Sequence, residues 1–319
     1  MNSRRQFIKK TTLGAASLYA SPYQEYLTEL KKVKKDGIQL YSLPKSLDND
    51  FVGAVKMLAQ MGYRELELFG PYPFSNQKAI DSWSKVTPML GFKGSGYFGR
   101  DIKEVKSILQ DNGLKTPSAH TDLDTLENNM GKLGEAAHIL GHKYVVLPSV
   151  PDERRKTMDD YKRIAEAFNK IGENAKKEGL KFAYHNHGYG LKAVNGQVPL
   201  NIILDNTDPN LVFFEMDIYW TAAGGADPID YLDKYPNRYH LLHLKDMKEK
   251  KTFSGDGNDA SQWIAMFPYM TTAGDGVLGV KEIVKKAQAV GVKHFLVEQD
   301  MVAQPEIALK RSIDFLKKT

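Results

Sequence analysis

Short apolar runs rich in β-branched and aromatic residues alternate along most of the chain with longer segments of helical periodicity. The apolar runs predict strands at 37–43, 63–69, 114–120, 143–149, 180–187, 211–218, 239–245 and 294–299. The periodic segments predict helices at 51–62, 101–112, 126–140, 159–178, 279–290 and 305–317. A glycine that favours helix termination stands just before five of these strands, at Gly62, Gly113, Gly141, Gly179 and Gly291.

This alternation predicts a single-domain α/β fold, because eight β/α units are what a (β/α)₈ TIM barrel needs. A doubly wound parallel sheet is the alternative, but no glycine-rich dinucleotide loop follows its first predicted strand. The longest connection runs from Met247 to Gly279 and is rich in aromatic residues. It either folds over the mouth of the barrel and lines a substrate pocket, or forms a surface excursion with its own apolar cluster.

The first twenty residues have the order of an export signal. The segment Ser3-Arg4-Arg5-Gln6-Phe7-Ile8-Lys9 resembles the twin-arginine signal, and a mildly apolar run with small residues follows it up to Ala20. We therefore expect a signal peptide at 1–20, a polar spacer at 21–36, the barrel at 37–319, and export to the periplasm. A basic amphipathic helix that stays attached is the alternative.

Charge and composition narrow the class of partner. The formal net charge is +5, and removing the four basic residues of segment 1–20, which contains no acid, lowers it to +1. A nearly neutral mature protein gives no electrostatic reason to expect nucleic acid. No stretch of eighteen apolar residues is present, so we expect no stable membrane association after export. The absence of cysteine means that any metal site is built from histidine and carboxylate.

Four chemically active residues stand at the ends of four predicted strands: His185, Asp217, His243 and Glu298. The carboxyl ends of barrel strands meet at one rim, where active sites of this fold lie. Two imidazoles and two carboxylates are a sufficient set of ligands for one divalent ion. A single histidine at a strand end is more often a hydrogen-bonded structural residue, but four such residues on four strands favour a metal site.

From about residue 37 onward the chain resembles the xylose isomerase-like TIM-barrel family, often labelled sugar phosphate isomerase/epimerase. The motifs that carry the resemblance are Tyr184-His185-Asn186-His187-Gly188, Met216-Asp217-Ile218-Tyr219-Trp220, His243-Leu244-Lys245-Asp246 and Val297-Glu298-Gln299-Asp300. The resemblance implies one divalent ion, Mn²⁺, Mg²⁺, Co²⁺ or Zn²⁺, on a ring of Glu, Asp, His and Glu. Asp217, His243 and Glu298 match this ring, whereas His185 stands where many epimerases have glutamate.

The resemblance also implies proton abstraction beside a carbonyl, with an enediolate intermediate. We expect Glu298 to be the base, His187 the acid or second base, and Lys245 a partner of a substrate oxygen. Glu67 and His120 are expected to bind sugar hydroxyls, and Trp220 to stack on the sugar. Trp220 also stands where the family's nuclease branch, which resembles endonuclease IV, needs a metal-binding histidine, which argues against a nuclease.

The expected activity is a sugar isomerase or epimerase. Because phosphorylated sugars are scarce outside the cytoplasm, export favours a non-phosphorylated sugar or keto-sugar as the small-molecule partner. A lyase or dehydratase that removes a β-substituent from a keto-sugar or keto-glycoside at the same site is the second reading. A periplasmic sugar-binding barrel without catalytic activity is the alternative of another class. A homo-oligomer is compatible with the sequence.

Overall fold

The structure is a computed structural model that describes residues 34–319. The predicted signal peptide and most of the predicted spacer lie outside the described residues. Those residues contain eight barrel strands: β1 (Gly37–Gln39), β2 (Glu65–Phe69), β3 (Lys115–His120), β4 (Tyr144–Leu147), β5 (Lys181–His185), β6 (Val212–Asp217), β7 (Tyr239–Leu244) and β10 (His294–Val297).

These strands are parallel and close into a barrel in the order β1-β10-β7-β6-β5-β4-β3-β2. β1 pairs with β2 on one side and with β10 on the other, so the sheet has no open edge. All eight predicted strands are therefore present, and the prediction of a (β/α)₈ barrel is confirmed. A doubly wound sheet is excluded, because such a sheet is open.

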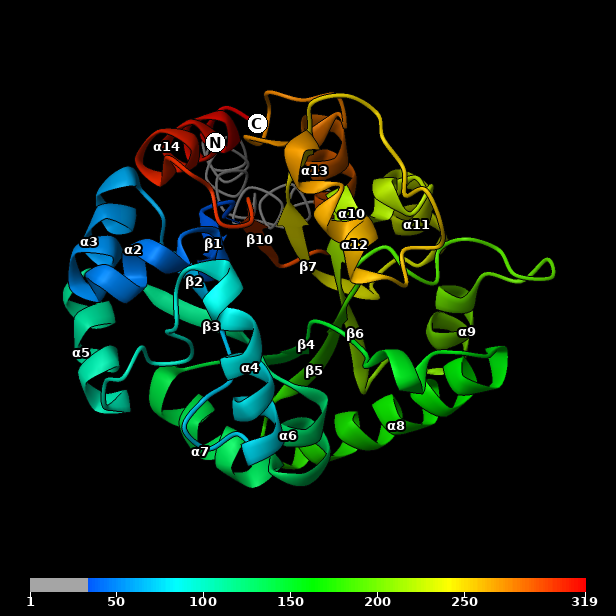
Figure 1. Ribbon diagram of the computed structural model, residues 1–319, viewed down its shortest axis with the longest axis horizontal. Helices are drawn as coiled ribbons and strands as arrows, with labels where there is room; N and C mark the ends of the chain where they lie inside the picture. Colours follow the sequence, from blue (N-terminus) through cyan, green and yellow to red (C-terminus); the bar gives the residue numbers. More distant parts are fainter. Residues whose placement is uncertain (1–33) are drawn as a thin grey trace, which may run out of the picture. The chain divides into compact units, whose positions relative to one another are not determined.

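Helices surround the barrel (Figure 1). They are α2 (Pro44–Asn49), α3 (Phe51–Met61), α4 (Gln77–Leu90), α5 (Ile102–Asp111), α6 (Leu123–Asn128), α7 (Met130–Leu140), α8 (Met158–Lys177), α9 (Pro199–Asn206), α10 (Ile218–Ala223), α11 (Pro228–Lys234), α12 (Ala260–Ile264), α13 (Val280–Ala289) and α14 (Pro305–Lys317). Short 3₁₀ helices are η1 (Leu40–Ser42), η2 (Asp152–Arg154) and η3 (Phe267–Tyr269), and a small antiparallel sheet pairs β8 (Asp246–Met247) with β9 (Met270–Thr271). Among the described residues, no helix is both long enough and apolar enough to cross a membrane.

Two predicted elements differ from the structure for local reasons. The strand predicted at 37–43 ends at Gln39, whose side chain accepts a hydrogen bond from the backbone N–H of Tyr41 and begins η1. The helix predicted at 126–140 is interrupted at Asn129, which has non-helical backbone angles and donates from its side chain to the carbonyl of Phe74. Asparagine favours such breaks because its side chain competes for backbone hydrogen bonds.

Inward-facing residues of the barrel strands form an apolar cluster that includes Tyr144, Phe213 and Leu296. His240 lies against this cluster, with its ring centroid 4.0 Å from that of Phe213 and its Nδ1 3.0 Å from the Tyr144 hydroxyl. Burial, reinforced by Lys181, lowers the pKa of His240 to about 3. The imidazole is therefore neutral in the folded protein at physiological pH.

We expect replacement of His240 by glutamine to reduce the sensitivity of the fold to acid. The unfolded histidine, with a pKa of about 6.5, binds a proton before the folded one does, so stability is full above that pH and falls as the pH drops toward 3. Urea unfolding at pH 7 and pH 5 should show that the wild type loses roughly 2 kcal/mol more free energy of unfolding than the variant. Equal losses would contradict this assignment.

Candidate metal centre

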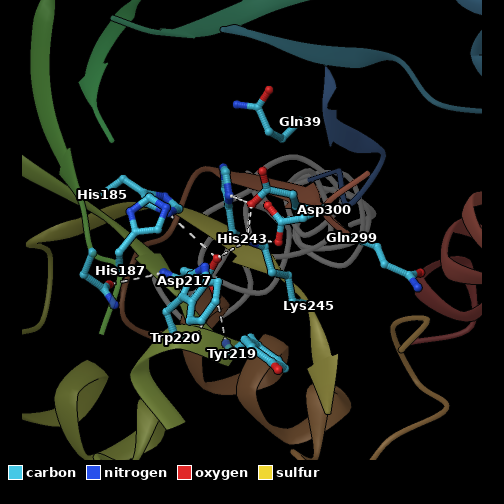
Figure 2. Close-up of polar contacts among 12 residues, drawn as sticks. Gln39, His185, His187, Asp217, Tyr219, Trp220, His243, Lys245, Gln299 and Asp300 are labelled. Atoms are coloured by element: carbon cyan, nitrogen blue, oxygen red, sulfur yellow. Dashed lines mark hydrogen bonds and ion pairs between the residues drawn. The ribbon is translucent and has the colours of Figure 1, made fainter. Parts of the chain in front are cut away.

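The four predicted metal ligands meet at the carboxyl-terminal mouth of the barrel. β5 ends at His185 and β6 at Asp217, His243 is the penultimate residue of β7, and Glu298 directly follows β10. Figure 2 shows the side chains of His185, Asp217 and His243 directed toward one another. One ligand atom of each of the four residues lies within 4.8 Å of the others, and all four residues are buried.

Asp217 uses its two carboxylate oxygens differently. Oδ1 accepts the backbone N–H groups of Tyr219 and Trp220, at 2.9 and 3.0 Å, and so caps the N-terminus of α10. Oδ2 is buried and lies 2.9 Å from Nζ of Lys245 and 3.8 Å from Nε2 of His185. It makes no contact with a backbone N–H group, so it is the oxygen of Asp217 that can also bind a metal ion.

The ring of His243 is held by Glu67 of β2, which lies deeper in the barrel than the candidate ligands. Oε2 of Glu67 accepts hydrogen bonds from Nε2 of His243, at 2.7 Å, and from the side-chain amide of Gln39, at 2.8 Å. An ionised carboxylate cannot donate, so Nε2 of His243 carries the hydrogen in this contact. The other nitrogen, Nδ1, faces Oε2 of Glu298 at 2.8 Å. Because the carboxylate of Glu298 is also ionised, Nδ1 donates a hydrogen bond to it, and an ion bound at Nδ1 would replace that hydrogen while Glu67 fixes the orientation of the ring.

His185 is held in the same way by Glu215, a residue that the sequence analysis missed. Oε2 of Glu215 accepts hydrogen bonds from Nδ1 of His185, at 2.9 Å, and from Nε2 of His120, at 2.7 Å. Nε2 of His185 is left to face Asp217. The signal was available, because Glu215 and Asp217 are two residues apart in one strand and so point to the same side.

Glu67, His120 and Glu215, which we call the lower layer, lie beneath the candidate ligands and are ionised at neutral pH. Burial alone would lower the pKa of His120, but Glu67 and Glu215 raise it to about 9. Burial and the neighbouring Glu67 would raise the pKa of Glu215, but His243 and His120 bring it to about 2. The histidine rings above are therefore anchored by charge-assisted hydrogen bonds, which are stronger than neutral ones.

Lys245 lies beside the candidate ligands in a cage of three carboxylates. Its Nζ is 2.9 Å from Oδ2 of Asp217, 2.6 Å from Oε2 of Glu298 and 2.9 Å from Oδ2 of Asp300. Burial would lower the pKa of Lys245, but these carboxylates raise it well above its ordinary value. From the sequence, Lys245 is expected to contact a substrate oxygen, and no role is predicted for Asp300. In the structure the two residues form an ion pair.

The balance of buried charge leaves room for a divalent cation. The carboxylates are Glu67, Glu215, Asp217 and Glu298, which are buried, and Asp300, whose side chain is 9% exposed. The cationic side chains among them are Lys245, His120 and, when protonated on both nitrogens, His243. An excess of negative charge in a dry site is unfavourable unless a cation compensates it. The buried cluster of His185, Asp217, His243 and Glu298 could therefore hold one metal ion, and its nitrogen and oxygen ligands suit Zn²⁺, Mn²⁺ or Co²⁺ better than Ca²⁺.

His187 lies next to this cluster with one free nitrogen. Its Nδ1 is 2.6 Å from the carbonyl oxygen of Pro148, which can only accept, so Nδ1 carries the hydrogen. Burial, reinforced by Lys245, lowers the pKa of His187 to about 3. The ring centroid is 4.7 Å from that of His185 and 5.3 Å from the centroid of Trp263. Nε2 therefore presents a lone pair, as a proton acceptor requires.

The three residues expected to contact the sugar, Glu67, His120 and Trp220, are all buried. Glu67 is fully buried, and its Oε2 is occupied by His243 and Gln39. His120 is only 7% exposed and belongs to the lower layer, and Trp220 is 2% exposed. Because none of them presents a large accessible surface, the structure gives them supporting positions beneath and beside the candidate ligands.

The long connection after β7 explains the burial of Trp220. Its Phe253 stacks on the Trp220 indole, with an interplanar angle of 9° and centroids 5.9 Å apart. Trp263 of the same connection stacks beside His187 at the mouth, and Tyr219 donates from its hydroxyl to the carbonyl of Met266. Both expectations for this segment are therefore met in part, because it forms its own apolar cluster and also borders the site.

Glu215→Gln is expected to weaken metal binding without unfolding the protein. The amide is neutral, so His185 loses a charge-assisted hydrogen bond and becomes a weaker, less oriented ligand. Loss of such a supporting carboxylate typically costs about 10- to 100-fold in metal affinity. Calorimetric titration with Zn²⁺ or Mn²⁺ checks this, with Glu282→Gln on α13 as the control of equal charge change. Unchanged affinity in Glu215→Gln would contradict the supporting role.

Comparisons with known proteins agree with this geometry. The family model for the xylose isomerase-like TIM barrel matches residues 55–319. The crystal structure of a sugar phosphate isomerase/epimerase of Parabacteroides distasonis superposes with a TM-score of 0.69 at 28% identity, over 89% of this chain and 93% of that one.

Two curated relatives are inosose dehydratases. That of Clostridium perfringens is 28% identical over 186 residues, which are 51% of this chain and 62% of the relative. That of Lacticaseibacillus casei is 26% identical over 268 residues, which are 73% of this chain and 86% of the relative. The match to the first relative thus spans less than two thirds of its length. With a closed (β/α)₈ barrel and a buried His/Asp/Glu cluster at its mouth, the chain belongs to the xylose isomerase-like TIM-barrel family.

Proposed function

We propose that the protein is a divalent-metal-dependent lyase that removes a β-substituent from a non-phosphorylated keto-sugar. The observation that carries the proposal is a cluster that could hold a metal ion and that provides two unprotonated acceptors, Glu298 within it and His187 beside it. All described polar contacts of the Glu298 carboxylate are made by Oε2, which leaves Oε1 available. Nε2 of His187 is available because its hydrogen is on Nδ1.

The metal ion would be held by His185, Asp217, His243 and Glu298, and it would supply polarisation of the substrate carbonyl, which acidifies the adjacent C–H group. Oε1 of Glu298 takes that proton, and the C–H electron pair moves toward the carbonyl. The pair then forms a C=C bond as the C–O bond to the β-substituent breaks. The leaving oxygen keeps the electrons of the broken bond and receives the proton from Glu298. The products are an unsaturated ketone and water or an alcohol, and the carboxylate is regenerated.

Two features favour elimination over the isomerisation that the sequence analysis placed first. The curated relatives described above are dehydratases. In addition, His185 occupies the position of the first metal-bound glutamate of many epimerases, so the site lacks the symmetric glutamate pair that exchanges protons on both faces of a sugar. Elimination needs only one base on one face, and Glu298 provides it.

We also propose that the protein is exported to the periplasm. The twin-arginine-type segment at 3–9 supports export of a folded, metal-loaded protein, and export supports a substrate without phosphate. Fractionation of cells that express the full chain, compared with an Arg4→Lys/Arg5→Lys variant, tests this. Retention of both forms in the cytoplasm would contradict export.

The activity is tested by nuclear magnetic resonance in D₂O, with the Zn²⁺- or Mn²⁺-loaded protein and a panel of keto-sugars and an inosose. The expected result is deuterium incorporation next to the carbonyl together with a new vinylic signal, both lost in EDTA. Deuterium incorporation with an isomeric product and no vinylic signal would assign an isomerase instead. Binding without exchange in the metal-loaded protein would favour a sugar-binding barrel.

A further inference from the structure

Arg155 is a buried cation that does not belong to the candidate metal centre. It directly follows η2 in the connection between β4 and α8, and only 5% of the residue is exposed. The carboxylate that pairs with it, that of Asp152, is 3.7 Å away and is half exposed to solvent. A buried guanidinium with so weak an ion pair is costly unless other acceptors satisfy its N–H groups, so its neutral partners explain its position.

These neutral partners come from three segments that are far apart in the sequence. Nε of Arg155 donates to the carbonyl of Val150, at 3.0 Å, within the β4–α8 connection. Nη1 donates to Oδ1 of Asn258, in the long connection after β7, and Nη2 donates to the carbonyl of the same residue at 3.4 Å. The guanidinium also lies over the ring of Tyr189, 3.9 Å from its centroid, in the segment after β5. One side chain therefore ties the three segments together.

Two of the tied segments hold the ring of His187. In the β4–α8 connection, the carbonyl of Pro148 accepts the hydrogen of Nδ1 at 2.6 Å. In the long connection, the indole of Trp263 stacks on the ring, with an interplanar angle of 27° and centroids 5.3 Å apart. The indole N–H donates to the carbonyl of Gly257 at 2.7 Å, one residue before the asparagine that the guanidinium binds. The orientation of His187 therefore depends on how the two connections are held together.

We propose that Arg155 is a positioning residue, which keeps His187 and Trp263 in place by tying the long connection to the β4–α8 connection. The inference rests on the proposed function only where it concerns turnover, in which Nε2 of His187 is one of the two acceptors. The tie itself is a property of the folded protein and can be measured without substrate. Its loss lets the long connection move away, which exposes Trp263 to water and frees the ring of His187.

Two variants break the tie from its two ends. Arg155→Met removes the guanidinium and leaves an unbranched apolar side chain in its place. Asn258→Ala removes the amide from a partly exposed position in a loop, so it tests the same contact even if Arg155→Met does not fold. Arg154→Met is the matched control, because this neighbouring arginine has a side chain that is 41% exposed and pairs instead with Glu127 of α6, at 3.1 Å.

The first measurement is iodide quenching of tryptophan fluorescence at saturating Zn²⁺, in a Trp83→Phe background. Trp220 is 2% exposed and is shielded from iodide, so the quenched signal comes from the partly buried Trp263. We expect the quenching constant to rise about twofold or more in both variants, and the double variant to show no further rise, because the two residues form one contact. The control variant should match the background protein. An unchanged constant in both variants, or additive changes in the double variant, would overturn the proposal.

The second measurement is deuterium exchange into the substrate of the proposed reaction. We expect folded, Zn²⁺-loaded Arg155→Met and Asn258→Ala to lose about tenfold in kcat, because misplacing a catalytic group by about 1 Å can cost about 10²-fold. Wild-type kcat in both variants, together with a raised quenching constant, would show that the tie does not position His187 and would overturn the proposal. Absence of turnover in the wild type contradicts the proposed function, and the fluorescence result then decides on the tie.

Discussion

Glu298→Gln is expected to lower solvent-deuterium exchange next to the substrate carbonyl by roughly 10³-fold, because the amide cannot take the proton. The carboxylate is well placed for this transfer. Its Oε2 is fixed by His243 at 2.8 Å and by Lys245 at 2.6 Å, while Oε1 is left for the substrate. Burial would raise the pKa of Glu298, but Lys245 and His243 hold it below its usual range. The group is therefore ionised at neutral pH, which is the form a base requires.

Glu298 is also a candidate metal ligand, so the measurement must separate the two roles. Metal content should be determined on the same samples by inductively coupled plasma mass spectrometry, and exchange should be measured at saturating Zn²⁺ or Mn²⁺. Glu306→Gln, an exposed carboxylate on α14, is the matched control and should behave as wild type. Exchange at the wild-type rate in metal-loaded Glu298→Gln would exclude Glu298 as the base and leave His187, whose Nε2 is the other free acceptor.

The barrel and the four candidate metal ligands could be predicted because each depends on short stretches of sequence. Each strand is an apolar run followed by its polar end residue, so His185, Asp217, His243 and Glu298 are recognisable from short motifs. The parallel order of β5, β6, β7 and β10 then brings these ends together. The prediction depends only on the fold, because all carboxyl ends of barrel strands lie at the same rim.

The lower layer could not be predicted in the same way, because it depends on which side chains meet across the barrel. His120 of β3 reaches Glu215 of β6, 95 residues away, and Glu67 of β2 reaches His243 of β7, 176 residues away. Strand alternation indicates that such residues point inward, but it does not pair them. The sequence therefore suggests Glu67 and His120 only as possible partners of sugar hydroxyls, and their contacts with His243 and Glu215 become visible only in the structure.

The burial of Trp220 could not be predicted from the sequence either. Its position just after Asp217 indicates a residue at the mouth, and an indole there is a reasonable partner for a sugar. The structure buries it because Phe253, 33 positions later in the longest connection, stacks on its face. The sequence leaves the course of this connection open, so the burial of Trp220 depends on tertiary packing.

The second large effect is expected at Asp217, where metal binding and folding can be separated. Asp217→Asn keeps an oxygen that can accept the N–H groups of Tyr219 and Trp220, so the cap of α10 is preserved. It removes the negative charge of Oδ2, the atom that faces Nε2 of His185 and the ammonium group of Lys245. Because a neutral amide is a far weaker ligand for a divalent ion, we expect metal affinity to fall more than 100-fold, roughly 3 kcal/mol.

Asp227→Asn provides the matched control, because Asp227 caps α11 in the same way by accepting the N–H of Ile229 at 2.7 Å. Thermal unfolding should be recorded with and without Zn²⁺ for both variants and the wild type. Binding of an ion to the folded state raises the melting temperature, and at a given ion concentration the rise is larger when the dissociation constant is lower. The wild type and Asp227→Asn should therefore gain stability on adding Zn²⁺, whereas Asp217→Asn should gain almost none. An equal gain in all three proteins would mean that the ion binds elsewhere, and the centre at the barrel mouth would have to be abandoned.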